Sequence, residues 1–140
     1  SLIIDDSYNA SPLSAQAALD TLKEFGDKVI LKTGAGRKIA VLGDMKELGI
    51  FTERAHRLIG NLAGERAEYL FTVGPAAKFI ADSARRSLGE GGFGENIFTF
   101  ETAEEAKESI RDFVREGDIV LVKGSRAMEL ERIVEALATL

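Results

Sequence analysis

Three short polar segments hold the side chains best suited to bind a ligand, and each follows a run of apolar residues. They are residues 5–12, 43–49 and 123–126. In the first, a carboxylate such as Asp6 can accept two hydrogen bonds from a ribose diol, as acidic residues do at strand ends in nucleotide-binding α/β folds. Tyr8 can stack on a base or simply cover the rim of the site. The alternative is that Asp6, Ser7 and Asn9 only shape the turn and cap the following helix.

The segment 123–126 places Lys123 and Arg126 beside a glycine and Ser125, at the expected start of the last helix. The free amides and the macrodipole of a helix N-terminus favour anions, so two cations there oppose the helix unless an anionic ligand binds. Arg126 has the planar fork that holds a carboxylate or phosphate at two points. The alternative is a salt link from Arg126 to Glu129 or Asp44.

Two further residues are candidates for the same site. Asp44 could orient an amine, or could be a solvated turn residue. His56, the only histidine, is of the residue type most suited to proton transfer near neutral pH, but a lone histidine is more often a surface or packing residue. No phosphate-binding loop of the Gly-x-x-x-x-Gly-Lys-Ser/Thr type and no supported Ser-His-Asp set is present, so the chain carries no complete catalytic set.

Composition limits the classes of protein. The chain has 140 residues, 45% of them hydrophobic, and a net charge of −5, which fits one globular domain without a nucleic-acid partner. The absence of cysteine and the single histidine exclude disulfides, thiolate zinc sites and multi-His metal sites. No apolar run approaches the ~20 residues that cross a bilayer. We expect a cytoplasmic domain without membrane insertion, and the apolar run directly after Ser1 suggests a piece of a longer chain.

Five apolar runs without in/out alternation predict strands that are buried on both faces. These are residues 2–5, 39–42, 70–73, 97–100 and 119–122. Helical spacing follows each run, over residues 12–25, 52–63, 75–88, from 102 to before 117, and 125–137, with caps expected at Ser11, Thr52 and Thr102, the last in a capping box with Glu105. Gly26 is the expected stop of the first helix, and residues 29–31 could add an edge strand.

This order predicts an α/β fold of three layers, a doubly wound, mostly parallel sheet of five to six strands with helices on both faces. Ligands bind beyond the carboxyl ends of the strands in such sheets. The three polar segments should therefore meet along one edge. The loops of the other edge, such as residues 117–118, look blander.

Several segments together carry a resemblance to a known family. They are DDSYNASP (5–12), IAVLGDMKELG (39–49), His56, VG (73–74), VLVKGSR (120–126) and Met128-Glu129. In this order and spacing, over essentially the whole chain, the sequence resembles the C-terminal, Rossmann-like domain of the bacterial Mur ligases. The resemblance is greatest to the members that join D-alanyl-D-alanine to UDP-MurNAc-tripeptide with cleavage of ATP.

The resemblance implies roles and partners. Asp6 would bind the ATP ribose, with Tyr8 and Asn9 near the nucleotide. The dipeptide would be bound by residues of the other two segments and the histidine: Lys123, Ser125, Arg126, Asp44 and His56. An N-terminal domain for the UDP-sugar and a central domain with the phosphate loop and the Mg²⁺ ligands would lie outside this chain, which alone should be inactive. The alternatives are a Mur ligase that adds another amino component, or a stand-alone nucleotide-binding regulatory module.

Overall fold

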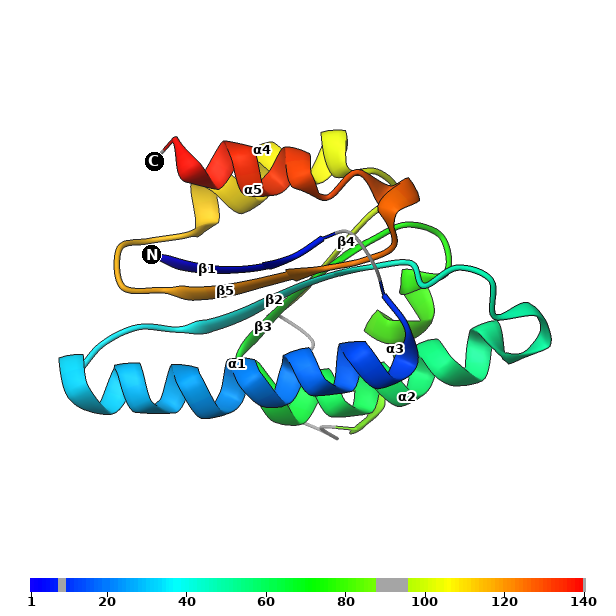
Figure 1. Ribbon diagram of the computed structural model, residues 1–140, viewed down its shortest axis with the longest axis horizontal. Helices are drawn as coiled ribbons and strands as arrows, with labels where there is room; N and C mark the ends of the chain where they lie inside the picture. Colours follow the sequence, from blue (N-terminus) through cyan, green and yellow to red (C-terminus); the bar gives the residue numbers. More distant parts are fainter. Residues whose placement is uncertain (8–9, 88–95, 140) are drawn as a thin grey trace.

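A single parallel sheet forms the centre of the molecule (Figure 1). The computed structural model describes residues 1–7, 10–87 and 96–139. Each of the five apolar runs is a strand: β1 Leu2–Asp6, β2 Lys38–Gly43, β3 Tyr69–Val73, β4 Ile97–Phe100 and β5 Ile119–Lys123. The strand order is β1-β5-β2-β3-β4, and every neighbouring pair is parallel. The predicted strands and their parallel arrangement are confirmed.

Helices cover both faces of the sheet, which gives the predicted three layers (Figure 1). On one face lie α1 (Pro12–Thr33), α2 (Thr52–Arg66) and α3 (Ala77–Ser87), and on the other lie α4 (Ala103–Phe113) and α5 (Glu131–Ala138). Successive side chains of a strand point to opposite faces. In β5, Leu121 therefore joins the core under α1 to α3 and Val122 the core under α4 and α5. A strand between two cores must be apolar throughout, which is why no alternation is visible in the sequence.

The helix caps are only partly as predicted. Ser11 caps α1, since its Oγ accepts from the Ser14 amide at 3.1 Å. Thr102 caps α4 by accepting from the Glu105 amide at 3.2 Å, although the Glu105 carboxylate accepts from the Glu101 amide rather than completing a box with Thr102. The predicted cap at Thr52 is wrong. A 3-10 turn, η1 (Gly49–Phe51), leads directly into α2, and the Thr52 hydroxyl donates back to the Gly49 carbonyl.

Helix α1 does not stop at Gly26. It continues to Thr33 and ends at Gly34, whose φ of +79° is the left-handed conformation that glycine adopts without strain. Gly26 is buried, and a Cβ at this position would lie 2.7 Å from Lys38 Cγ. The glycine therefore marks a close approach of helix and strand. The expected end at residue 25 and the possible edge strand at 29–31 are both wrong.

The last helix begins later than predicted. Residues Arg126–Met128 form a 3-10 turn, η3, and Glu129 is left-handed with a φ of +54°. Helix α5 starts only at Glu131. Residues 89–96, which are rich in glycine and predict a surface loop, lie almost wholly outside the described residues. Within the described ranges, no helix combines the length and apolar character that crossing a membrane requires.

The amino-terminal edge of the sheet holds a buried ion pair. Arg37, just before β2, donates to the Asp118 carboxylate through Nη2 at 2.6 Å and Nε at 3.1 Å, and to the Phe113 carbonyl at 2.8 Å. The amides of Arg37 and Arg115 also donate to Asp118. The loop at 117–118, expected to offer little to a ligand, has a structural role, because Asp118 ties the start of β5 to the segment before β2.

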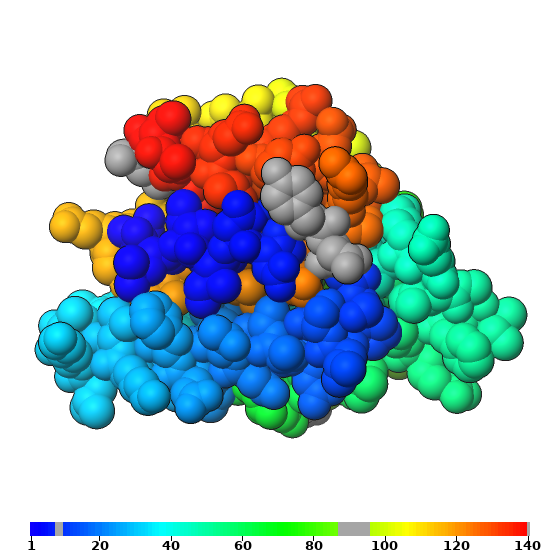
Figure 2. Space-filling model, viewed as in Figure 1, coloured from blue at the N-terminus to red at the C-terminus, as the bar shows by residue number. Residues whose placement is uncertain are grey.

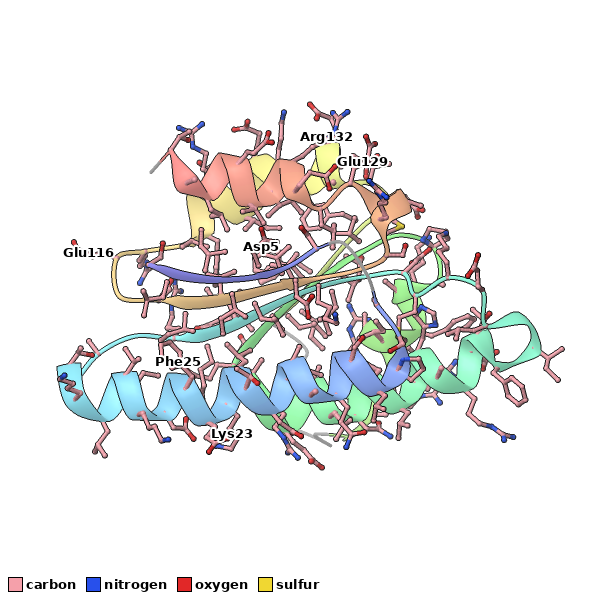
Figure 3. All side chains as sticks on the ribbon, viewed as in Figure 1. Asp5, Lys23, Phe25, Glu116, Glu129 and Arg132 are labelled. Atoms are coloured by element: carbon pink, nitrogen blue, oxygen red, sulfur yellow. The ribbon has the colours of Figure 1, made fainter. Side chains whose placement is uncertain are left out.

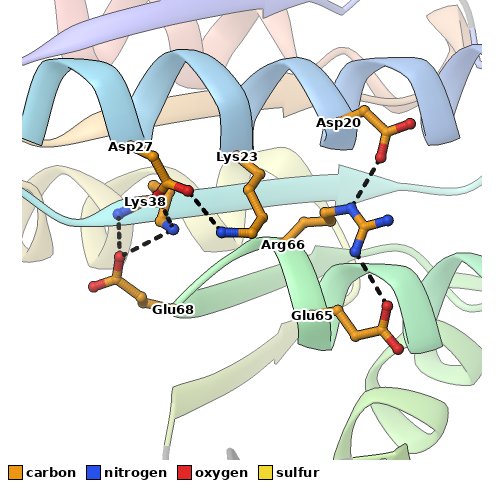
Figure 4. A network of polar contacts seen from close by, with 7 residues as sticks. All are labelled: Asp20, Lys23, Asp27, Lys38, Glu65, Arg66 and Glu68. Carbon is orange, nitrogen blue, oxygen red and sulfur yellow. Dashed lines mark hydrogen bonds and ion pairs between the residues drawn. The ribbon is translucent and has the colours of Figure 1, made fainter.

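A second polar network ties α1 to β2 and α2 on the same side of the molecule (Figure 4). Lys38 Nζ lies 2.6 Å from Asp27 Oδ1, and Lys23 lies 2.6 Å from the other oxygen of that carboxylate. Arg66 Nε lies 2.9 Å from Asp20. The Lys38–Asp27 pair joins α1 to the start of β2, the Arg66–Asp20 pair joins α1 to α2, and the Lys23–Asp27 pair lies within α1.

Candidate functional site

The three polar segments meet at the carboxyl edge of the sheet, as predicted. Strand β5 lies between β1 and β2, and the register pairs Lys123 with Asp6 on one side and with Leu42 on the other. In the space-filling view, β1 is at the surface between the layers of α1 and α5, and the segment that contains η1 projects at the same end of the molecule, beyond the segment that follows β5 (Figure 2). The segments that follow β1, β2 and β5 are therefore neighbours in space.

Asp6 ends β1 with its side chain 49% exposed. One oxygen, Oδ2, accepts from Lys123 Nζ at 2.6 Å, and the lysine side chain is only 2% exposed. The carboxylate is thus held from below by a buried ammonium group while it still faces solvent. Tyr8 and Asn9, which the resemblance places near a nucleotide, lie outside the described residues.

The turn after β1 is shaped by Asp5 rather than by Asp6. The Asp5 carboxylate accepts from the Ser7 hydroxyl at 2.7 Å and from the Ser7 amide at 3.1 Å, and Asp5 lies on the face of β1 that looks toward α5 (Figure 3). Sequence reasoning missed this role of Asp5, although an aspartate two residues before a serine is a common turn signal. Because Asp5 shapes the turn, the solvent-facing part of Asp6 is left for a ligand.

Asp44 is not a solvated turn residue. Its side chain is 1% exposed, and Oδ1 accepts from the amide of Ala77, the first residue of α3, at 2.7 Å. A carboxylate at this position satisfies a free helix amide and complements the macrodipole. Oδ2 lies 3.4 Å from Lys46 Nζ. Asp44 therefore joins the end of β2 to α3, and its oxygens already have partners within the domain.

His56 is completely buried and connects the same loop to α2. Its Nε2 accepts from the Met45 amide at 2.9 Å, so Nδ1 carries the proton that it donates to the Thr52 carbonyl at 2.6 Å. Both ring nitrogens are engaged by backbone groups. The structure contradicts a direct contact of His56 with a substrate and gives it the role of holding the 43–49 loop.

The loops after β2 and β5 touch through their glycines. A Cβ on Gly124 would lie 2.5 Å from Leu130 Cδ1 and 3.1 Å from the Cα of Gly43, so any other residue here would have to push its neighbours away. The Ser125 amide donates to the Asp44 carbonyl at 2.9 Å. The Ser125 Oγ is buried and finds no partner among the described residues. A buried hydroxyl without a partner is costly, so this Oγ marks a hydrogen bond that the described residues leave unmade beside the candidate site.

Arg126 is exposed in η3. The helix N-terminus predicted beside it is wrong, because α5 begins five residues later. The alternative salt links are not formed either. Glu129 pairs with Arg132 at 3.4 Å (Figure 3), Asp44 is held by Lys46 and the α3 amide, and no ion pair of Arg126 occurs in the described part of the chain. The guanidinium is therefore available to an anion from outside the domain.

The edge thus combines a carboxylate fixed by a buried lysine, a buried hydroxyl and an exposed guanidinium. The carboxylate can bind a diol, such as the ribose of a nucleotide. The guanidinium can bind an anion, such as the carboxylate of a second substrate. Asp44 and His56, predicted to belong to the binding surface, support the loops instead. The glycines at the ends of β2 and β5 were the available signal for the close contact of these loops.

Comparison with known proteins gives a consistent picture. A family model described as "Mur ligase, glutamate ligase domain" matches residues 1–126. The chain is 32% identical, over 96% of its length, to the UDP-N-acetylmuramoyl-tripeptide–D-alanyl-D-alanine ligase of Bacillus subtilis (strain 168), and 31% identical, over 97%, to that of Escherichia coli (strain K12). It spans 27% and 26% of the length of these relatives.

Two solved structures are similar over nearly the whole chain. The MurF ligase from Thermotoga maritima, in complex with ADP, has a TM-score of 0.71 at 28% identity, and the match covers 98% of this chain and 28% of that one. A MurF structure from Acinetobacter baumannii has a TM-score of 0.76 at 26% identity, and the match covers 99% of this chain and 28% of that one. The fold matches one part of longer ligases.

Proposed function

The chain belongs to the Mur ligase family, and we propose that it is the C-terminal domain of a three-domain ligase that joins D-alanyl-D-alanine to UDP-MurNAc-tripeptide. The reaction belongs to peptidoglycan precursor synthesis and cleaves ATP to ADP and phosphate. The observation that carries the proposal is the pairing of Asp6 with Lys123 in the sheet register. This register places Asp6, which would bind the nucleotide, beside the start of the loop after β5, which would bind the dipeptide.

Each exposed group of the edge has a part in this proposal. Asp6 accepts hydrogen bonds from the ribose hydroxyls of ATP. Arg126 holds the carboxylate of D-alanyl-D-alanine, for which a planar guanidinium is suited, and the Ser125 hydroxyl gives a further hydrogen bond there. Asp44 and His56 act indirectly, by keeping the neighbouring loop in place.

The chemistry of the proposed reaction proceeds in two steps. An oxygen of the tripeptide carboxylate attacks the γ-phosphorus of ATP, which forms an acyl phosphate and releases ADP. The uncharged amine of the dipeptide then attacks the acyl carbon, the amide bond forms, and phosphate leaves as the amine loses a proton. This domain contributes by positioning the amine and by excluding water when the ligase closes.

The remaining parts of the reaction belong to the rest of the ligase. We place the UDP-sugar site in an N-terminal domain, and the phosphate-binding loop and the ligands of Mg²⁺ in a central domain. The complete protein is expected to work in the cytoplasm, where its nucleotide substrates are found. This chain alone should have negligible ligase activity, and phosphate release from it that depends on the dipeptide would contradict the proposal.

Steady-state kinetics of the complete ligase test the two roles. Asp6→Ala should raise the KM for ATP and leave the KM for D-alanyl-D-alanine nearly unchanged, and Arg126→Ala should do the reverse. Loss of a charge-assisted hydrogen bond is worth about 1.5–3 kcal/mol, so each KM should rise about 10- to 100-fold. Asp112→Ala and Arg111→Ala, exposed residues of α4, are the matched controls.

The outcomes distinguish the alternatives. An unchanged dipeptide KM in Arg126→Ala would remove Arg126 from the carboxylate role. If the wild-type ligase prefers another amino component, the result would support the alternative of a Mur ligase that adds that component. A protein that binds ATP but forms no amide bond with any amino component would favour a regulatory module.

A further inference from the structure

Lys123, at the end of β5, lies beneath the carboxylate of Asp6, the residue proposed to bind the nucleotide. It does not lie in the solvent-exposed part of the carboxyl edge. Its side chain is 2% exposed, whereas that of Asp6 is 49% exposed. Its Nζ donates to Asp6 Oδ2 at 2.6 Å. We propose that Lys123 is a positioning residue for the nucleotide, which fixes the Asp6 carboxylate for the ribose, and that it does not contact the dipeptide. This inference rests on the proposed function.

The direction of the side chain follows from the alternation along the strands. Leu121 packs in the core under α1 to α3, and Lys123, two residues on, lies on the same side of β5. In β1, Ile4 packs against that core, and Asp6 is two residues further. The register places the two ends side by side, so the lysine and the carboxylate meet on the α1 side of the sheet.

The chain then leaves this side. After Gly124 it turns toward the other layer, where Met128 and Leu130 pack in the core under α4 and α5. Lys123 and Arg126 are therefore separated by the turn that changes layers, although only two residues stand between them. The lysine works with the end of β1, and the arginine belongs to the loop that faces the dipeptide.

The ion pair is better explained by positioning than by stability. Removing an ammonium group from water costs free energy. Its attraction to a carboxylate that is half exposed to water offsets only part of this desolvation free energy. An apolar side chain of the same length would fill this place with little loss of stability. A lysine at this position, unlike a methionine, can donate a hydrogen bond to one oxygen of the Asp6 carboxylate. This bond limits the rotation of the Asp6 side chain and directs the remaining lone pairs toward a ligand.

The test uses the complete ligase with three variants: Lys123→Met, Asp6→Asn and the double variant. Lys123→Met should raise the KM for ATP about 10-fold, the size expected for one charge-assisted bond, and leave the KM for D-alanyl-D-alanine within twofold of wild type. The KM for ATP of the double variant should be no higher than that of Asp6→Asn alone, because the lysine acts through the Asp6 carboxylate. Lys123→Arg, which keeps the charge, should recover part of the ATP affinity.

Several outcomes would overturn the inference. A rise in the dipeptide KM with an unchanged ATP KM would make Lys123 a dipeptide ligand, and losses that multiply in the double variant would show that it acts independently of Asp6. If Lys123→Met unfolds, the same comparison is made with Lys123→Gln, and loss of folding in both would show that the lysine is structural. An unchanged ATP KM in Asp6→Asn would instead contradict the proposed function, so the two failures are distinguishable.

Discussion

The two edges of the sheet use charged residues in different ways. At the amino edge, Arg37 and Asp118 satisfy each other and three backbone groups within the domain. At the carboxyl edge, the Asp6 carboxylate is half exposed, the Ser125 hydroxyl has no partner among the described residues, and Arg126 stands in solvent. Polar groups that are satisfied internally hold the fold together, and groups that are held in place but not satisfied are available to a ligand.

The guanidinium of Arg37 keeps its charge at physiological pH. The hydrogen bond to Asp118 raises the pKa of Arg37 above its ordinary value. A raised pKa of a cation gives stability that is fully present below the ordinary value and is lost only as the pH rises through the raised value. This contribution therefore stays constant over the whole physiological range.

The largest expected effect comes from breaking the amino edge. Asp118→Ala leaves the Arg37 guanidinium, 17% exposed, without its carboxylate, and should lower the free energy of unfolding by about 3–5 kcal/mol. Arg126→Ala, at the other edge, should change it by less than about 0.5 kcal/mol. Urea unfolding of the two variants measures both values. Equal losses in the two variants would remove the distinction between the edges.

An intermediate effect is expected inside the carboxyl edge. His56→Leu removes the acceptor of the buried Met45 amide, so it should cost about 1–3 kcal/mol of stability. Leu58→Ala, in the same helix but 52% exposed, is a control for the loss of a side chain from α2. A His56→Leu variant as stable as wild type would show that the histidine does not hold the loop, and its assignment as a supporting residue would be withdrawn.

The smallest effect belongs to the exposed network of Figure 4. The hydrogen bond from Lys23, followed by that from Lys38, lowers the pKa of Asp27 from 3.8. A lowered pKa of an acid gives stability that is present above the ordinary value and is lost as the pH falls through the lowered one. Asp27→Asn should cost about 0.5 kcal/mol near pH 7, since exposed pairs are screened.

That difference should shrink below about pH 4, where the carboxylate takes up its proton. Unfolding of wild type and Asp27→Asn at pH 7 and in acid measures the change. A difference that is independent of pH would mean that the ion pairs of Asp27 are not its cause.

The strands were predictable because burial on two faces leaves a continuous apolar run, as in β5. The predicted helix boundaries were wrong at positions where one residue type can serve two structural purposes. Gly26 is a close contact with Lys38 rather than a helix stop, and Thr52 donates backward instead of capping. Distinguishing these uses requires knowledge of the neighbouring element, which local sequence does not contain.

The candidate site was predictable in its place but not in its division of roles. The polar segments after three strands pointed to one edge. The partner of Asp44 is an amide 33 residues away, and that of Lys123 is a carboxylate 117 residues away. Whether a charged residue is buried and paired or exposed depends on such distant partners, so the partners of Asp44, His56 and Lys123 could be identified only in the folded chain.

A structure of the complete ligase with a non-hydrolysable ATP analogue and D-alanyl-D-alanine bound is the most direct test of the division of work at the carboxyl edge. We expect Asp6, still bonded to Lys123, to accept hydrogen bonds from the ribose hydroxyls while Arg126 holds the dipeptide carboxylate. A ribose that is bound away from Asp6, or a dipeptide carboxylate held by Lys123 rather than Arg126, would contradict it.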